Sequence, residues 1–286
     1  MNRPAFLLAL TASAPTLGSN GNAAEARFEA EERRGSGRLG VAAIDLRTGR
    51  RIGRRGAERF PLASTFKVPL VMCVLKRVDA GRERLARDVR FTARDVLAYS
   101  PVVAGNVRKG SLTVGELCAA AIEESDNAAA NLLLRSVGGP PGVDAYLRSV
   151  GDTATRLDRS EPALNVSIPG DPRDTTTPDA MANLLARLVR DPVLSPASKA
   201  LLFGWMRAAK TGLTRLRAGV PPGWIVGDKT GTTDTAANDI AILWPPSGAP
   251  VVIAAYFAGV KASEAERDAA IASVARTALA SFRRPV

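Results

Sequence analysis

The chain has 286 residues, 46% of them hydrophobic, so it can bury a substantial core as one large domain or two interleaved lobes. It contains no histidine, which excludes Ser-His-Asp and Cys-His catalysis and His-based metal sites. The formal net charge is +11, but the arginines are scattered and only 5% of residues are aromatic. This pattern favours an Arg-rich solvated surface over a nucleic-acid-binding one.

The N-terminus resembles a secretory signal with a short apolar core. Residues 5–10 are apolar, and small residues extend as far as Ala24. Cleavage near Ala23 or Ala24 leaves a mature chain that starts at Glu25, and the alternative is a disordered N-terminal arm. No later segment approaches the ~20 apolar residues that span a bilayer. We therefore expect a periplasmic or secreted protein with no membrane segment after signal cleavage.

The predicted elements place strands at both chain ends and helices between them. Apolar and turn residues predict a hairpin over 38–53, and helical spacing predicts a helix over 68–78 that starts at or just before Ser64. A capping box begins at Thr113. Further helices are expected over 117–122, 127–137, 142–150, 177–189, 195–206 and 263–282, and further strands over 224–229, 239–244 and 251–257.

This order predicts an α+β fold. An antiparallel sheet formed from both chain ends is flanked by helices, and an all-α lobe is inserted, with a cleft between the two. The expected boundaries are a signal peptide over 1–24, an α/β lobe over 25–57 and 208–286, and an all-α lobe over 58–207.

Three short motifs occur once each along the chain: Ser64-Thr65-Phe66-Lys67, Ser125-Asp126-Asn127 and Lys229-Thr230-Gly231. Residues three apart on a helix share a face, so Lys67 can reach Ser64 and act as its base when burial lowers the pKa of the amine. The N–H groups at a helix start can bind an oxyanion. On its own, Ser-x-x-Lys usually marks a helix cap followed by a surface lysine. The prediction of a catalytic serine therefore depends on the three motifs together.

The set resembles the class A serine β-lactamases and the related penicillin-binding proteins, from about Leu39 to the C-terminus. The resemblance implies hydrolysis of the β-lactam amide through an acyl-enzyme, and antibiotic resistance. It makes Ser64 the nucleophile and Lys67 a candidate base for acylation. Ser125 then passes a proton to the β-lactam nitrogen, and Lys229 supplies positive charge near Ser125 and the substrate carboxylate.

The segment Glu161-Pro162-Ala163-Leu164-Asn165 lies in a stretch without periodicity over 158–174. It resembles the class A loop whose glutamate and asparagine hold the deacylating water, which makes Glu161 the deacylation base. The alternative is an ordinary exposed loop carboxylate. The acylation base stays open between Lys67 and Glu161. The same resemblance implies a cis Glu161–Pro162 peptide and an ion pair between Arg159 and Asp174.

Other residues are expected to bind substrate. By resemblance, Asn127 bonds the side-chain amide and Tyr99 forms a wall at the cleft mouth. No arginine lies between Thr232 and Ile240, so Arg215 is expected to replace the arginine that grips the carboxylate in many members. The catalytic candidates are Ser64, Lys67, Ser125, Glu161 and Lys229, and the substrate-binding candidates are Tyr99, Asn127, Asn165, Arg215, Thr230, Gly231 and Thr232, with an oxyanion hole of the Ser64 and Thr232 N–H groups.

No metal ligand set or cofactor motif is expected, and the expected partner is a small-molecule β-lactam bound by a monomer. The two cysteines are expected to be free thiols, because Cys73 lies two positions beyond the expected partner of Cys118 in a disulfide found in some members. Two rival readings remain. A D,D-peptidase shares the first three motifs, but Glu161 and Asn165 weigh against it. A β-lactam sensor domain is disfavoured by the lack of a transmembrane segment.

Overall fold

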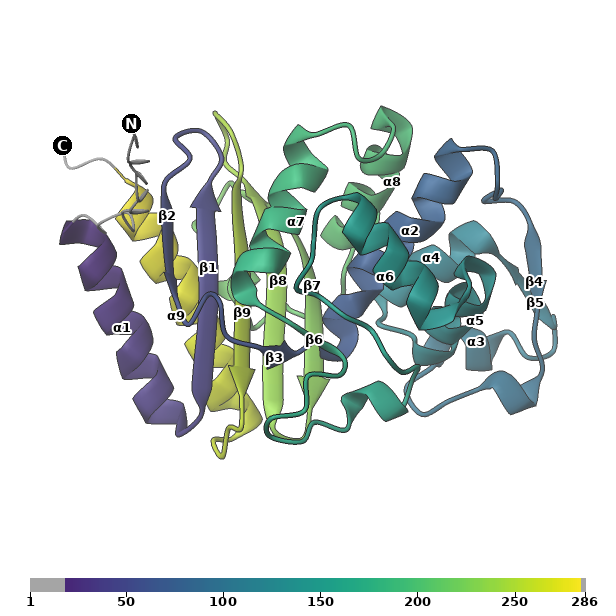
Figure 1. The fold of residues 1–286 in the computed structure, drawn as a ribbon, viewed down its shortest axis with the longest axis horizontal. Helices are drawn as coiled ribbons and strands as arrows, with labels where there is room; N and C mark the ends of the chain where they lie inside the picture. Colours follow the sequence, from purple (N-terminus) through teal and green to yellow (C-terminus); the bar gives the residue numbers. More distant parts are fainter. Residues whose placement is uncertain (1–18, 284–286) are drawn as a thin grey trace, which may run out of the picture.

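The computed structural model describes residues 19–283 (Figure 1). Most of the predicted signal, residues 1–18, lies outside the described residues. Residues 19–24 form the start of helix α1 (Ser19–Gly35), so the predicted cleavage near Ala23 or Ala24 falls within this helix. None of the helices in the described range is long and apolar enough to cross a membrane.

A five-stranded antiparallel sheet joins the two ends of the chain, as predicted (Figure 1). Its order is β2-β1-β9-β8-β7. The N-terminal strand β1 pairs along its whole length with the C-terminal strand β9, from Arg38 opposite Ala258 to Asp45 opposite Val251. The strands are β1 (Arg38–Asp45), β2 (Arg51–Arg54), β7 (Ile225–Thr233), β8 (Ala236–Trp244) and β9 (Val251–Ala258).

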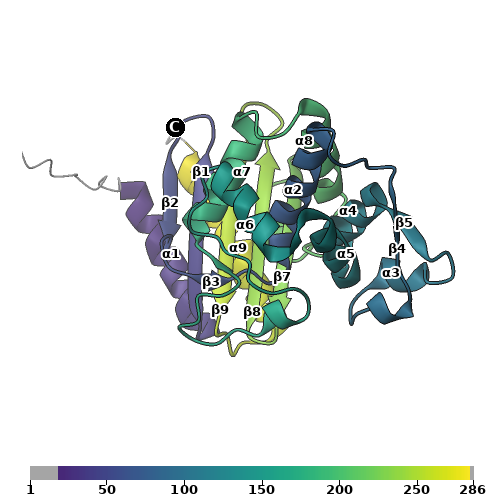
Figure 2. The same ribbon diagram turned by 45° about the vertical axis from the view of Figure 1, so that its right-hand side comes forward.

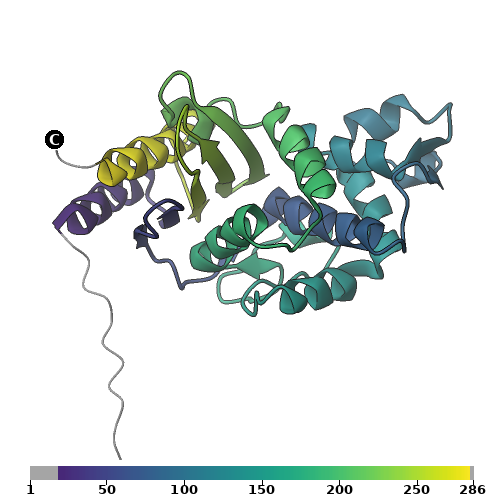
Figure 3. The ribbon, with the colours of Figure 1, turned by 90° about the horizontal axis from the view of Figure 1, so that it is seen from above.

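Helices α1 and α9 (Glu264–Phe282) lie side by side on one face of this sheet (Figure 3). The sequence pattern does not predict α1, because Phe28 is its one large apolar side chain. Tertiary contacts hold the helix instead. Phe28 is fully buried, and the buried Glu32 pairs with Arg54 and Arg55, at the end of β2, at 2.5 and 2.7 Å.

Most of the other helices lie beyond the β7 edge (Figure 2), and their core continues onto one face of the sheet through residues such as Ile240, Ile242 and Tyr256. Helix α2 is central, with every residue from Lys67 to Leu75 buried, and it contacts α4, α5, α6 and α8. Helix α7 instead packs on the sheet face opposite α9, against β1 and β9. The helices are α2 (Lys67–Asp79), α3 (Pro101–Gly105), α4 (Val114–Glu123), α5 (Asn127–Val137), α6 (Gly139–Ser149), α7 (Pro178–Arg190) and α8 (Pro196–Arg207).

Two short two-stranded ribbons lie outside the main sheet. Strand β3 (Phe60–Pro61) pairs with β6 (Thr175–Thr176), so the chain entering the helical region lies beside the end of the 158–174 loop. Strand β4 (Asp88–Arg90) pairs with β5 (Ser111–Thr113) at the far end. The capping box predicted at Thr113 is confirmed, with Glu116 as its second member.

Several element boundaries differ from the sequence expectation. Helix α2 begins at Lys67, after a 3₁₀ turn over Ala63–Phe66. Helix α6 begins at Gly139 rather than 142, because the prolines that look like a break fit its first turn, where no intrahelical N–H is needed. Strands β7 and β8 extend through Gly231, Asn238 and neighbouring polar residues, since pairing with a central strand overrides their weak strand propensity.

Candidate active site

The nucleophile candidate Ser64 lies in the 3₁₀ turn that precedes α2, and Lys67 is the first residue of that helix. One turn therefore separates the two side chains, and Lys67 Nζ donates to Ser64 Oγ at 2.8 Å. The lysine is completely buried and also donates to the Ser125 carbonyl oxygen at 2.8 Å and to Asn127 Oδ1 at 2.6 Å. Two of the three sequence motifs thus meet at one amine.

Ser125, Asp126 and Asn127 form the joint between α4 and α5. Ser125 has a φ of 59°, a left-handed conformation that turns its side chain into the site. Asp126 caps α5 through Ala129 N–H and also accepts from the N–H groups of Val102 and Val103. Through these bonds Asp126 braces the joint, which leaves its two neighbours to face the site.

Strand β7, at the sheet edge, brings the third motif to the same place. Lys229 Nζ donates to Ser125 Oγ at 2.9 Å and to the Thr230 carbonyl oxygen at 2.8 Å. Gly231 allows the strand to approach the nucleophile, because a Cβ there would lie 2.9 Å from the Leu62 carbonyl oxygen and 3.2 Å from Ser64 N. No other residue fits this contact without displacing the Ser64 turn.

Glu161 enters the site from the 158–174 loop. The Glu161–Pro162 peptide is cis, and Arg159 pairs with Asp174 at 2.5 Å across the base of the loop, so both predicted features are confirmed. Glu161 is 3% exposed. Its Oε1 lies 3.4 Å from Lys67 Nζ, and its Oε2 accepts from Asn165 Nδ2 at 2.6 Å.

Asn131 holds the backbone of Glu161 and is absent from the sequence prediction. Its Nδ2 donates to the Glu161 carbonyl oxygen at 2.8 Å, and its Oδ1 accepts from the Glu161 N–H at 3.0 Å. The sequence held one sign of this role. Asn131 follows Asn127 by four residues on a mainly apolar helix, so the two amides lie on one face.

The two buried lysines have lowered pKa values. Burial lowers the pKa of Lys67 to about 8, while the charge of Glu161 opposes this effect. Burial, together with the positive charge of Lys67, holds the pKa of Lys229 well below its usual value of 10.5. Both amines can therefore lose a proton far more readily than a surface lysine, which suits them to proton transfer.

The motifs open onto a cleft of about 580 Å³. Tyr99 is 61% exposed at its edge, and its carbonyl oxygen accepts from Asn127 N–H at 3.1 Å. Lys67, Glu161 and Lys229 lie buried behind the cleft wall. The lining includes the sequence-predicted Ser64, Tyr99, Ser125, Asn127, Asn165, Arg215, Thr230 and Thr232, and also the unpredicted Thr211, Leu213, Glu264 and Asp268.

Arg215 is only 5% exposed, and its guanidinium lies beside β7. It donates to Thr232 Oγ1 at 2.9 Å and to the carbonyl oxygens of Gly231 and Asn238 at 3.2 and 2.9 Å. Asp268 of α9 fixes it from behind at 2.7 Å. The predicted replacement arginine is thus next to Thr232, another of the predicted substrate-binding residues.

Comparisons with known proteins give one consistent result. The family model described as Beta-lactamase enzyme family matches residues 23–282. Beta-lactamase CTX-M-97 of Escherichia coli is 42% identical over 270 residues, 94% of this chain and 92% of that protein. The solved class A β-lactamase GNCA4, named as the last common ancestor of Gram-negative bacteria, is 53% identical with a TM-score of 0.89 and coverages of 91% and 100%. A solved β-lactamase of Xanthomonas campestris pv. campestris is 48% identical with a TM-score of 0.88 and coverages of 90% and 97%.

The chain belongs to the class A β-lactamases. This protein is therefore a hydrolase that acts on β-lactams, an activity that confers antibiotic resistance, as the three motifs predicted. Of the readings that the shared motifs left open, the family model, the relative and the solved structures all support the β-lactamase.

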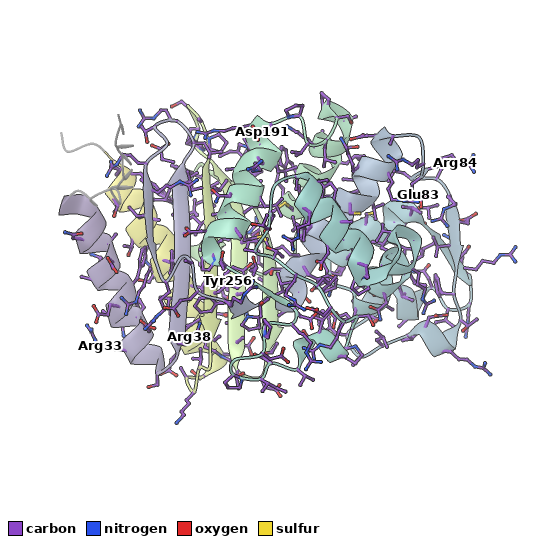
Figure 4. All side chains as sticks on the ribbon, viewed as in Figure 1. Arg33, Arg38, Glu83, Arg84, Asp191 and Tyr256 are labelled. Carbon is purple, nitrogen blue, oxygen red and sulfur yellow. The ribbon has the colours of Figure 1, made fainter. Side chains whose placement is uncertain are left out.

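The cysteines of this β-lactamase agree with the sequence expectation. Cys73 and Cys118 are both free and buried. Among residues 19–283, no group of three or more Asp, Glu or Cys side chains is placed to hold a metal ion. Figure 4 shows Arg33 and Arg38 at one end of the molecule and Arg84 at the other, which fits a basic charge spread over the surface.

The 3₁₀ turn that carries Ser64 is also held by contacts with the sheet. Thr65 Oγ1 and the hydroxyl of Tyr256 on β9 lie 3.2 Å apart, and the tyrosine is completely buried (Figure 4). Asn238 Nδ2 donates to the carbonyl oxygens of Pro61 and Leu62 at 2.8 and 3.3 Å. These contacts fix the segment before Ser64, and sequence reasoning missed them because strand periodicity gives no sign of such a contact.

Proposed function

We propose that this β-lactamase forms an acyl-enzyme on Ser64 and releases it by hydrolysis. The observation that carries the proposal is the position of Lys67 Nζ, which lies within 3.4 Å of Ser64 Oγ, Ser125 Oγ and Glu161 Oε1. A single buried amine thereby connects the nucleophile, a candidate acid for the leaving nitrogen and a candidate base for water.

In acylation, Ser64 Oγ attacks the β-lactam carbonyl carbon and transfers its proton to neutral Lys67. We assign this step to Lys67 because its Nζ already bonds Ser64 Oγ at 2.8 Å. The N–H groups of Ser64 and Thr232 stabilise the oxyanion of the tetrahedral intermediate. As the C–N bond breaks, Ser125 gives its proton to the ring nitrogen and regains one from Lys67, with Lys229 stabilising the transient charge.

In deacylation, Glu161 accepts a proton from water, which attacks the ester carbon and releases Ser64. Apart from its ion pair with Lys67 Nζ at 3.4 Å, Oε1 of Glu161 has no hydrogen-bond partner among residues 19–283, so it can accept this proton. Asn165 holds the other carboxylate oxygen and orients the group. As the ester breaks, Glu161 passes this proton to Lys67 and Lys67 passes one to Ser64 Oγ, which restores the starting protonation of all three groups.

The substrate carboxylate is proposed to bind at Lys229, Thr230, Thr232 and Arg215, a group of donors at the β7 edge. Gly231 lets the strand backbone reach the ligand. Asn127 has an amide N–H free after its bond to the Ala98 carbonyl oxygen, and we propose that this N–H meets the substrate's side-chain carbonyl. Tyr99 packs against the ring system from the cleft edge. The enzyme is proposed to act as an exported monomer.

The test is to mix purified protein with excess benzylpenicillin and to compare wild type with Glu161→Ala by turnover and intact mass. We expect many turnovers by the wild type and a trapped acyl adduct on the variant. One stable adduct on the wild type would contradict the role of Glu161. No adduct on either protein would contradict the role of Ser64.

A further inference from the structure

Two threonine hydroxyls on β7, those of Thr230 and Thr232, line the cleft, and each has a partner on its far side. Thr232 Oγ1 accepts from Arg215 Nη2 at 2.9 Å. A guanidinium can only donate hydrogen bonds, so the proton of the Thr232 hydroxyl remains available to another acceptor. An anion in the cleft is such an acceptor.

The partner of Thr230 is Thr211, whose Oγ1 lies 2.7 Å from Thr230 Oγ1. Both residues line the cleft, Thr230 nearly buried and Thr211 half-buried. Each hydroxyl has one proton, so Thr230 can donate either to Thr211 or to a substrate, but not to both. A bound carboxylate therefore favours the arrangement in which Thr211 donates and Thr230 points its proton at the ligand.

We propose that Thr211 is a positioning residue that donates its hydroxyl proton to Thr230 and so directs the Thr230 proton at the substrate carboxylate. This inference rests on the proposed role of Thr230 in binding that carboxylate. Thr211 then acts towards Thr230 as Arg215 acts towards Thr232, and hydrogen bonds in such a chain strengthen one another.

The segment that carries Thr211 is held in place on both sides. Lys210 N donates to the Glu123 carbonyl oxygen at 2.9 Å, and Arg215 N donates to the Gly212 carbonyl oxygen at 3.0 Å. Gly212 has a φ of 153° and lies against Asp228, where a Cβ would be 2.0 Å from Oδ2. Thr230 is fixed in turn by the bond from Lys229 Nζ to its carbonyl oxygen. Neither threonine can therefore move easily to restore a lost contact.

The experiment compares Thr211→Val and Thr211→Ser on benzylpenicillin and on its methyl ester, which lacks the carboxylate charge. We expect Thr211→Val to raise KM for the acid about tenfold and to leave KM for the ester within about twofold of wild type, because bonds to charged groups are the strong ones. Thr211→Ser, which keeps the hydroxyl, should restore the acid KM. Melting temperatures show whether each variant is folded, and Thr211→Ala replaces Thr211→Val if that variant does not fold.

Thr230→Val separates this inference from the proposed function. If Thr230→Val raises KM for the acid while Thr211→Val does not, the positioning role is wrong and the role of Thr230 stands. If Thr230→Val leaves KM for the acid unchanged, the carboxylate site itself is wrongly assigned and the inference falls with it. Equal losses on acid and ester in Thr211→Val would mean a structural role and would also overturn the inference.

Discussion

Glu161 Oε1 lies 3.4 Å from Lys67 Nζ, and both side chains are completely buried. Burial disfavours the charged amine, while the carboxylate favours it, and the balance leaves the pKa of Lys67 at about 8. The carboxylate of Glu161 thereby helps to set the charge of Lys67 at the centre of the site.

The pH dependence of acylation should follow Lys67. With a pKa of about 8, roughly one-tenth of Lys67 is neutral at pH 7, so acylation should accelerate as pH rises and level off above about 8. Stopped-flow or quenched-mass measurements of acylation across pH test this. A rate that does not change with pH would show that another group takes the Ser64 proton.

Glu161→Gln should move this profile to lower pH. The substitution removes the negative charge that raises the pKa of Lys67, so more of the amine is neutral at a given pH. The trapped acyl-enzyme of this variant makes the acylation step directly measurable. A shift to higher pH would contradict the electrostatic coupling of the two residues.

Asn131→Ala should slow deacylation far more than acylation. It removes both hydrogen bonds to the Glu161 backbone, at 2.8 and 3.0 Å, and a misplaced base costs on the order of 10²-fold in rate. Mass spectrometry during turnover should detect accumulated acyl-enzyme. Ser136→Ala on the same helix, which removes only a bond to the Leu133 carbonyl oxygen, is the matched control. Equal slowing of both steps would argue for a general loss of structure.

Arg215→Ala should raise KM for penicillins about tenfold with a smaller effect on kcat, because it removes a cation beside Thr232. Arg276→Ala, at an exposed position on α9, controls for the change in net charge. Steady-state kinetics that compare KM and kcat of the two variants test this prediction. If KM is unchanged in Arg215→Ala, Arg215 has no part in binding the carboxylate.

The two thiols should react only when the protein unfolds. Burial raises the pKa of the Cys73 thiol to about 11 and raises that of Cys118 further, so little reactive thiolate exists in the folded protein. Titration with a thiol reagent should detect both cysteines in denaturant without a reductant. Finding neither thiol under those conditions would indicate a disulfide.

The sequence by itself determined the chemistry of the site and the order of the main elements. Helical spacing placed Lys67 one turn after Ser64, and strands at both chain ends predicted a sheet made from both termini. These features are local, because periodicity and short motifs are encoded within a few neighbouring residues. The resemblance carried by the three motifs added Glu161, Arg215 and the cis peptide.

Only the tertiary structure decided how distant segments meet. It showed that Asn131 clamps Glu161 across 30 positions, that Thr211 lies behind Thr230, and that α1 forms although its own sequence is weakly apolar. It also extended β7 past Lys229 through pairing with β8. Such contacts depend on packing between elements far apart in the chain, and side-chain periodicity reports which face of an element is buried but not which partner covers it.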